Sequence, residues 1–119
     1  MEHIVRCATS FDASHRIEHD PWCGRGDGHH YRVEVSASAT VNAQNLLSIN
    51  PQAFQDDVEA LGHMLNGNNL NEMLPASRTY LEDIAAWFME SLLGRYKNLL
   101  QVRVWQNEAT SVIVTRQER

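Results

Sequence analysis

The sequence predicts an α+β domain in which two helices cover one face of a four-stranded antiparallel sheet, in the order β-β-α-α-β-β. Three observations support this fold class. Residues 29–41 alternate almost strictly between apolar and polar side chains, two later segments repeat apolar residues at helical spacing, and two short β-prone runs close the chain. Helices inserted between two strand pairs are typical of a sheet with both helices on one face.

The first two strands are expected on either side of a loop. A β-prone run over residues 4–11 predicts the first strand, and residues 18–28 predict the loop because they contain a proline and three glycines. Residues 29–41 predict a long second strand with one covered face. Its apolar face carries His29, Tyr31, Val33, Val35, Ala37, Ala39 and Val41, and its polar face carries His30, Arg32, Glu34, Ser36, Ser38 and Thr40.

Both helices have recognisable ends. Asn50 and Pro51 predict the start of the first helix, with asparagine as the cap and proline in the first turn. A capping box formed by Thr79 and Glu82 predicts the start of the second helix, and Gly94 its end, at the C′ position. The apolar stripes are Phe54, Val58, Leu61 and Leu65 in the first helix, and Leu81, Ile84, Ala85, Phe88 and Leu92 in the second.

Two short strands are predicted at the end of the chain, over residues 100–105 and 111–116, with a hairpin connection at residues 106–109. A sheet of four strands leaves two open edges, and such edges are normally paired or protected. We therefore expect edge-to-edge assembly into a homo-oligomer.

Composition argues against several classes of protein. The length of 119 residues fits one domain, residues 1–119. A net charge of −5, with Lys97 as the single lysine and no basic run, argues against nucleic-acid binding. The chain holds no apolar run of the about 18 residues that a membrane span needs, and its start has no apolar signal core. Two cysteines make no disulfide framework, so we expect a reducing, cytoplasmic location.

Histidines are concentrated in one stretch. His15, His19, His29 and His30 lie within sixteen positions, together with Cys23 and Asp27. Histidine clustered with cysteine and carboxylate is typical of a metal or acid-base site. The alternative is a set of scattered surface histidines.

The two-residue period of a strand separates these candidates. If the second strand extends back to position 27, Asp27, His29 and Tyr31 share one face and His30 points the other way. His15 can add a third ligand if the first two strands pair, and three protein ligands with an open position define a catalytic metal site. Each residue also has a structural interpretation: His29 as a core histidine, Asp27 as a turn residue, and Cys23 as a small buried side chain.

Several motifs resemble one enzyme family. Residues 11–17, FDASHRI, resemble the opening F-x-A-A-H-R-L of the 6-pyruvoyl-tetrahydropterin synthase and 6-carboxytetrahydropterin synthase family. Residues 23–33, CGRGDGHHYRV, resemble its C-x-x-L-H-G-H-x-Y-x-V block. Weaker similarities follow in order: LN at residues 70–71, EDIAAW at residues 82–87 and VRVW at residues 102–105.

The resemblance implies the tunnelling fold, in which β-β-α-α-β-β subunits form trimeric rings, usually stacked as hexamers, with active sites at subunit interfaces. Members of the family bind a catalytic zinc through three histidines. A cysteine acts as general base, and an Asp-His pair assists it in rearranging 7,8-dihydroneopterin triphosphate. A glutamate holds the pterin ring by accepting hydrogen bonds from the amino and ring N–H groups of the pterin.

The metal site carries over with one change. His15 matches the first zinc ligand of the family, His29 matches the third, and Cys23 matches the catalytic base. Asp27 stands where the family has its second histidine, and a carboxylate is a competent zinc ligand. Two histidines and one carboxylate also suit Fe(II), so zinc, Fe(II) and another divalent metal all stay open.

Two other functional positions depart from the family. Asn66 and Gly67 replace the Asp-His pair, and His63, one helical turn earlier, is a candidate substitute in the proton relay. Gln106 replaces the pterin-binding glutamate, and its amide offers one acceptor where a carboxylate offers two. Glu108 could restore the carboxylate if the turn bulges by two residues.

These residues favour a metal-dependent lyase of this family, acting on 7,8-dihydroneopterin triphosphate or a related pterin-like heterocycle. Two alternatives stay open at the level of the sequence. One is a diverged homologue with a different substrate or chemistry. The other is a non-catalytic pterin-binding protein.

Overall fold

The protein is a two-layer α+β structure, as predicted. The computed structural model describes residues 2–15, 28–74, 79–106 and 109–116. Its antiparallel sheet has the order β1-β2-β3-β4. The strands are β1 (His3–Ser14), β2 (Gly28–Ala39), β3 (Leu99–Gln106) and β4 (Thr110–Thr115). The helices are α1 (Pro51–Leu65), α2 (Leu70–Met73) and α3 (Leu81–Leu93).

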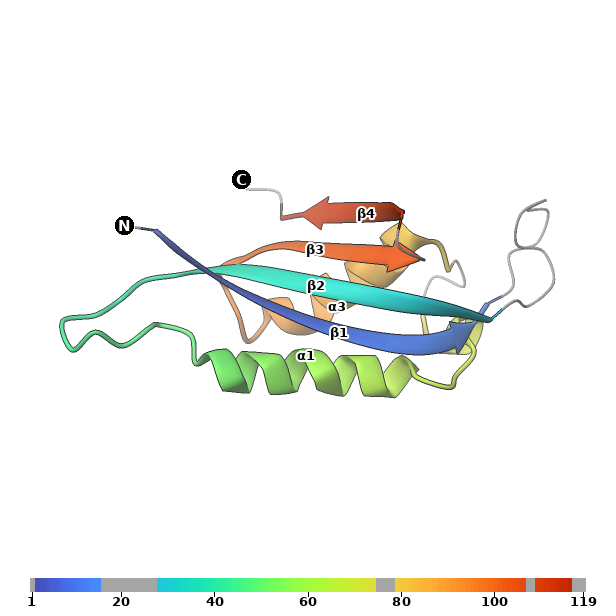
Figure 1. Cartoon of the computed structure of the whole chain (residues 1–119), viewed down its shortest axis with the longest axis horizontal. Coiled ribbons are helices and arrows are strands. Elements are labelled where there is room, and N and C mark those ends of the chain that lie inside the picture. Colours follow the sequence, from blue (N-terminus) through green and yellow to red (C-terminus); the bar gives the residue numbers. More distant parts are fainter. Residues whose placement is uncertain (1, 16–27, 75–78, 107–108, 117–119) are drawn as a thin grey trace.

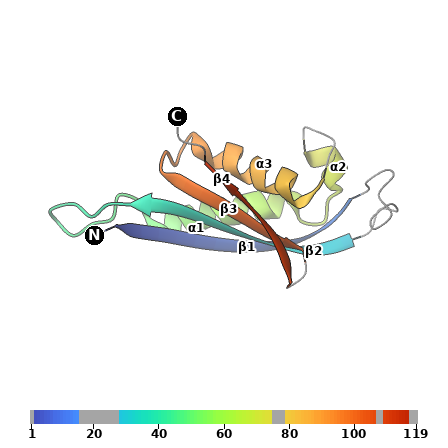
Figure 2. The ribbon, with the colours of Figure 1, turned by 90° about the horizontal axis from the view of Figure 1, so that it is seen from above.

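The helices lie on one face of the sheet (Figures 1 and 2). Helix α1 packs against β1, and α3 packs against β3 and β4. The alternation in β2 places Tyr31, Val33 and Val35 in the core beneath the helices, fully buried. Phe11, Phe54 and Phe88 complete this core from β1, α1 and α3. Among the described helices, none is long and apolar enough to cross a membrane.

Strand pairing determines which residues meet at the end of the sheet. Strands β1 and β2 pair from His3 opposite Ala39 to Ser14 opposite Gly28, so both reach further toward the intervening loop than the sequence predicted. Strand β2 pairs with β3 so that Tyr31 lies opposite Gln106. Residues from three strands are therefore brought together at one end of the core.

Helix α1 begins as predicted, with Asn50 as its N-cap and a proline in its first turn. The side chain of Asn50 accepts hydrogen bonds from the backbone N–H groups of Gln52 and Ala53, at 3.0 and 3.2 Å. Gly62 faces β1 so closely that a Cβ atom there would lie 2.6 Å from Oγ1 of Thr9. A glycine at this position lets the helix lie directly on the strand.

The segment after α1 runs along the edge of β1. Asn66 Oδ1 accepts a hydrogen bond from the N–H of Asp12 at 3.0 Å, and the N–H of Gly67 donates to the carbonyl of Asp12 at 2.7 Å. Gly67 has φ of +75°, a conformation that side-chain-bearing residues rarely adopt. The four-residue helix α2 follows, which the sequence pattern did not predict because it is too short to show a period.

The predicted start of the second helix was wrong by one residue. Tyr80 is the N-cap of α3, and its N–H donates to the carboxylate of Asp83 at 3.1 Å. Thr79 lies outside the helix and is 1% exposed. The end is also displaced, because Gly94 is the C-cap itself and has right-handed φ of −62° rather than the left-handed C′ conformation.

Candidate functional site

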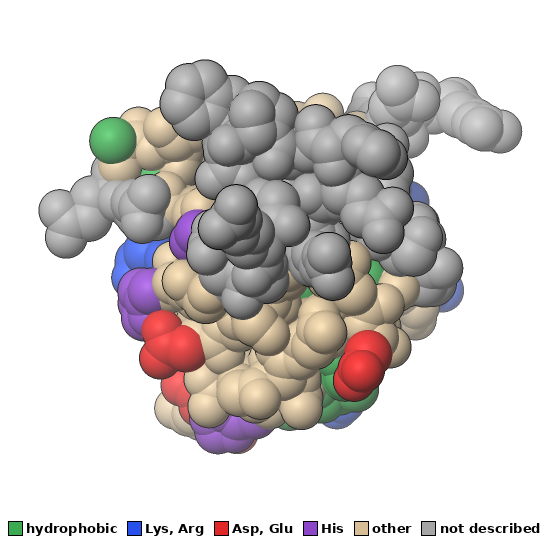
Figure 3. Space-filling model, turned by 90° about the vertical axis from the view of Figure 1, so that its right-hand side faces the viewer, with side chains coloured by type: hydrophobic (Ala, Val, Ile, Leu, Met, Phe, Trp, Pro, Cys, Tyr) green, Lys and Arg blue, Asp and Glu red, His purple; other side chains and the backbone are tan. Residues whose placement is uncertain are grey.

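The two histidines predicted to bind a metal meet at the loop end of the sheet. His15 follows β1 directly and His29 lies in β2, on the face that the helices cover. Their ring centroids are 4.8 Å apart and the rings are nearly perpendicular, at 86°. Tyr31 lies edge-on to both rings, with centroid distances of 6.2 and 6.0 Å. Figure 3 looks onto this end of the molecule, where several histidine and acidic side chains are visible at the surface.

His15 is buried and its ring is held from one side. Nδ1 lies 3.1 Å from the carbonyl oxygen of Thr79, 3.3 Å from the Thr79 hydroxyl and 3.4 Å from the Tyr31 hydroxyl. A carbonyl oxygen can only accept a hydrogen bond, so Nδ1 carries the proton and donates a hydrogen bond to the carbonyl of Thr79. Nε2 is then the nitrogen whose lone pair can bind a metal.

His29 is held by the neighbouring strand. Its Nδ1 lies 3.0 Å from Nε2 of Gln106, the last residue of β3. Both imidazoles therefore have Nδ1 in contact with an uncharged protein group. We refer to His15, His29, Tyr31, Thr79 and Gln106 as the histidine cluster.

The histidine cluster fits part of a zinc site. Neutral imidazole is a common zinc ligand, and an outer hydrogen bond to the second ring nitrogen is the usual arrangement around such ligands. The parts of the chain that the structure describes hold no group of three histidine, cysteine, aspartate or glutamate side chains that could bind a metal. Two of the three predicted ligands are thus brought together, and the third, Asp27, lies outside the described residues, as do Cys23 and Glu108.

His30 and His63 lie apart from the histidine cluster. His30 points to the opposite face of the sheet, as predicted, where its Nδ1 lies 2.8 Å from the carboxylate of Asp12. His63 is exposed in the last turn of α1. Among the described residues, no hydrogen bond or ring contact joins His63 to the cluster.

The cysteine that the structure describes has a structural environment. Cys7 is buried in the core of β1 and is not part of a disulfide. Burial, and to a smaller extent the charge of Glu59, raises the pKa of the Cys7 thiol. A thiol kept protonated in this way is a poor nucleophile.

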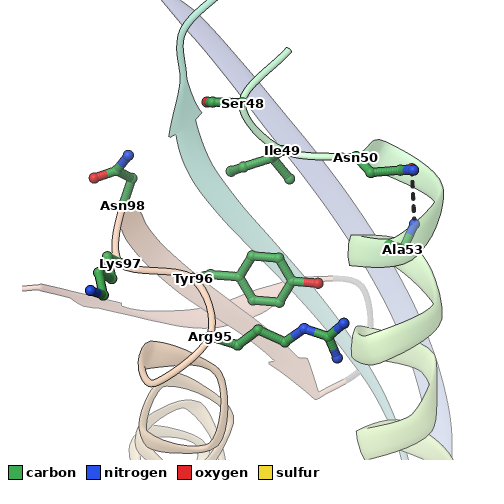
Figure 4. A pocket seen from close by; sticks show the side chains of 8 residues that line it. All are labelled: Ser48, Ile49, Asn50, Ala53, Arg95, Tyr96, Lys97 and Asn98. Carbon is green, nitrogen blue, oxygen red and sulfur yellow. Dashed lines mark hydrogen bonds between the residues drawn. The ribbon is translucent and has the colours of Figure 1, made fainter. Parts of the chain in front are cut away.

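A second polar region lies at the other end of α1. A cavity of about 380 Å³ opens between the start of α1 and the segment that follows α3. Figure 4 shows the Tyr96 ring and the Arg95 side chain extending across it toward α1. Arg95 pairs with Asp57 at 3.2 Å, and the Tyr96 hydroxyl donates to the same carboxylate. Burial and this carboxylate raise the pKa of Tyr96 to about 12.

Comparison with known proteins identifies the family. Residues 4–118 match the family model described as 6-pyruvoyl tetrahydropterin synthase. The chain belongs to this family. It is also 30% identical over 110 residues to the Archaeoglobus fulgidus protein named "Putative 6-carboxy-5,6,7,8-tetrahydropterin synthase", and the match covers 90% of each chain.

Solved structures of the 6-pyruvoyl tetrahydropterin synthase family share the fold. The Caenorhabditis elegans enzyme is 16% identical, with 98% of this chain and 97% of that chain covered and a TM-score of 0.81. The Plasmodium falciparum enzyme is 15% identical, with 97% and 98% covered and a TM-score of 0.76. The subunit fold that the motifs implied is thereby confirmed.

Residues at two functional positions of the family have structural contacts in this chain. Asn66 and Gly67, which stand where the motifs place the Asp-His pair, both bond to the backbone of Asp12. The positive φ at Gly67 disfavours any side chain there. Gln106, which stands where the motifs place the pterin-binding glutamate, contacts His29.

Sequence reasoning did not find the role of Thr79. This residue lies 64 positions from His15 and was interpreted as a helix cap. The signal that could have found it is weak, because a threonine near a helix start is normally a cap. The Asp12–His30 pair was also not predicted, although the register of β1 on β2 places the two residues opposite each other.

Proposed function

We propose that this protein is a metal-dependent lyase of the 6-pyruvoyl/6-carboxytetrahydropterin synthase type. Its substrate is 7,8-dihydroneopterin triphosphate or a related pterin-like heterocycle. The observation that supports this best is the pair of histidine rings 4.8 Å apart, each with Nδ1 in contact with an uncharged protein group. Family membership supports a tetrahydropterin-synthase-like reaction.

The proposed metal ligands are His15, Asp27 and His29. The metal is zinc, with Fe(II) or another divalent ion as the alternative for two histidines and one carboxylate. A bound divalent metal would polarise the side-chain oxygens of the substrate. The contribution of the chain is to hold both imidazoles in place, His15 through Thr79 and His29 through Gln106.

Four further residues complete the proposal. Cys23 is the proposed general base, because a thiolate next to a bound cation is favoured. His63, exposed one helical turn before the position of the Asp-His pair, is the proposed substitute in the proton relay. Gln106 and Glu108 are the proposed ligand-binding positions. Of these two, Glu108 offers the two carboxylate oxygens that match a pair of N–H donors.

The assembly and location are also proposals. Strands β1 and β4 are the edges of the sheet. We propose that they pair between subunits in a trimer or hexamer, with interfacial active sites. The proposed location is the cytoplasm, and neither nucleic acid nor a membrane is a proposed partner.

A diverged activity is the second candidate function. It is favoured by the contacts of Asn66 and Gly67 with the Asp12 backbone and of Gln106 with His29. Residues engaged in this way cannot perform the roles of the Asp-His pair and of the pterin-binding glutamate unchanged. A non-catalytic pterin-binding protein is the third candidate.

An assay with 7,8-dihydroneopterin triphosphate separates these candidates. The wild-type protein, loaded with Zn²⁺ or Fe²⁺, is compared with Cys23→Ala and His15→Ala. We expect turnover by the wild type, loss of turnover in Cys23→Ala, and loss of stoichiometric metal in His15→Ala. Full activity in either variant contradicts the proposal. Stoichiometric metal without turnover favours the diverged homologue, and heterocycle binding without metal favours the binding protein.

A further inference from the structure

The side chain of Gln106 is directed at a proposed metal ligand. Gln106 ends β3, is half-buried, and lies opposite Tyr31 in the β2–β3 register. Its Nε2 lies 3.0 Å from Nδ1 of His29. Because a strand register positions the backbone of Gln106, the side chain reaches His29 from a rigid element. We propose that Gln106 is a positioning residue that holds His29 in the orientation and tautomer that present Nε2 to the metal, an inference that rests on the proposed metal site.

The chemistry of the imidazole determines which atom of Gln106 acts in the metal-bound state. A neutral histidine that binds a metal through Nε2 carries its proton on Nδ1, so Nδ1 donates. The partner must then be an acceptor, and Gln106 supplies one through Oε1 after its amide turns over. Without metal, the same amide can donate from Nε2 to an unprotonated Nδ1. Gln106 can therefore remain bonded to His29 in both states.

His15 is also held at Nδ1, by a group that can only accept. Its Nδ1 donates to the carbonyl oxygen of Thr79 at 3.1 Å. The two neighbouring imidazoles are thus each held at Nδ1 by an uncharged group, one from β3 and one from the segment before α3. Outer hydrogen bonds of this kind orient metal-binding histidines, and their loss typically lowers metal affinity about 10–100-fold.

The contact with His29 also limits what position 106 can offer to a heterocycle. The amide of Gln106 has one oxygen and one nitrogen, and one of them is engaged by His29 in either orientation. Position 106 therefore does not offer two acceptors to a donor edge of a ring. Of the two proposed ligand-binding positions, Gln106 can therefore give the ring at most the one amide atom that His29 leaves free, and Glu108 would supply the paired acceptors.

Metal affinity of the full chain tests the proposal. The Zn²⁺ dissociation constant is measured by competition with a chromophoric chelator for the wild type, Gln106→Leu, Gln106→Glu and the control Gln101→Leu. Gln101 is half-buried in the same strand and lies opposite Ser36. We expect Gln106→Leu to bind Zn²⁺ about 10–100-fold more weakly. Gln106→Glu keeps an acceptor for Nδ1 of His29, so this variant should bind Zn²⁺ at least as tightly as the wild type. Gln101→Leu should bind Zn²⁺ as tightly as the wild type.

The outcomes separate this inference from the proposed function. A wild type that binds neither Zn²⁺ nor another divalent ion such as Fe²⁺ in stoichiometric amount overturns both. A wild type that binds Zn²⁺ while Gln106→Leu binds it within about twofold overturns the positioning role alone. Equally weak Zn²⁺ binding by Gln106→Glu and Gln106→Leu also overturns the positioning role. That role requires an acceptor at position 106, which glutamate keeps and leucine lacks. Ring ¹⁵N spectra of the Zn²⁺-loaded wild type should show His29 protonated at Nδ1, and a proton on Nε2 would contradict the proposal.

Discussion

The two polar regions at opposite ends of α1 differ in how their groups are balanced. Around Asp57, a carboxylate meets the guanidinium of Arg95 and the hydroxyl of Tyr96, so charge and hydrogen bonds are satisfied within the protein. In the histidine cluster, the side chains around the two imidazoles carry no charge, and Nδ1 of each imidazole is already in contact with a protein group.

This difference shows how a structural group of polar residues can be told from a site. We refer to Asp57, Arg95 and Tyr96 as the Asp57 group. These residues satisfy one another without a ligand, because the Asp57 carboxylate neutralises the Arg95 guanidinium. The histidine cluster holds two aromatic bases side by side with the same nitrogen of each engaged. For His15 the contact with Thr79 assigns the tautomer, because a carbonyl oxygen can only accept, and Nε2 is then the atom that would bind a metal.

The largest effect is expected from removing one imidazole of the histidine cluster. His29→Ala should weaken Zn²⁺ binding by more than about 100-fold, because the loss of a ligand exceeds the 10–100-fold loss typical of an outer partner. That ratio corresponds to more than about 2.7 kcal/mol. The measurement is chelator competition, with His30→Ala as the matched control from the opposite face of the same strand. Equal losses of Zn²⁺ affinity in His29→Ala and His30→Ala would contradict the assignment of the metal site to the His29 face of β2.

A substitution that moves α1 should disturb both regions together. Gly62→Ala places a Cβ atom 2.6 Å from Oγ1 of Thr9, so the helix or the strand must shift. Overpacking of this kind costs about 1–3 kcal/mol of unfolding free energy, measured by urea denaturation. Gly94→Ala is the control, because a Cβ atom there meets nothing within 4 Å. The double variant Thr9→Ala, Gly62→Ala should recover most of the loss, and no recovery would show that this contact is not the cause.

Removing the Tyr96 hydroxyl should affect only the Asp57 group. Tyr96→Phe loses a hydrogen bond to a partly buried carboxylate, and we expect about 1–2 kcal/mol of destabilisation near neutral pH, with Zn²⁺ affinity unchanged. A decrease in Zn²⁺ affinity would contradict the independence of the two regions.

Tyr96 also predicts a pH dependence. Its pKa is raised to about 12 in the folded protein, against about 10 in an unfolded chain. The folded state therefore favours the neutral phenol, and its stabilising contribution is complete below about pH 10 and is lost as the pH rises toward 12. Urea midpoints between pH 9 and pH 11.5 should fall more steeply for the wild type than for Tyr96→Phe. Parallel curves would argue against a raised pKa.

The sequence predicted those parts of the structure that depend on local patterns. The period of residues 29–41 predicted a half-buried strand and separated His29 from His30, and Asn50 with Pro51 predicted the start of α1. These features depend on neighbouring residues, so one sequence is enough to find them. The motifs around His15 and His29 indicated the family, which the comparisons confirm.

Contacts across the sheet could not be predicted in this way. The bond between His29 and Gln106 joins residues 77 positions apart and requires the register of β3 on β2, which no local pattern contains. The bond between Thr79 and His15 spans 64 positions, and a threonine at that place was interpreted as a helix cap. Both contacts involve groups that hold the proposed metal ligands. The sequence therefore predicted the candidate ligands and not the groups that hold them.

The smallest effect is expected on the outer face of the sheet, at the Asp12–His30 pair. The two side chains are 76% and 64% exposed, so their pairing at 2.8 Å contributes under about 1 kcal/mol. Asp12→Asn and His30→Gln should shift urea midpoints little and leave Zn²⁺ affinity unchanged, because His30 points away from the face that carries His29. A large loss of Zn²⁺ affinity in His30→Gln, with stability preserved, would place His30 itself in the metal site. The different roles assigned to the two neighbouring histidines would then be wrong, since that assignment depends on the alternation of faces along β2.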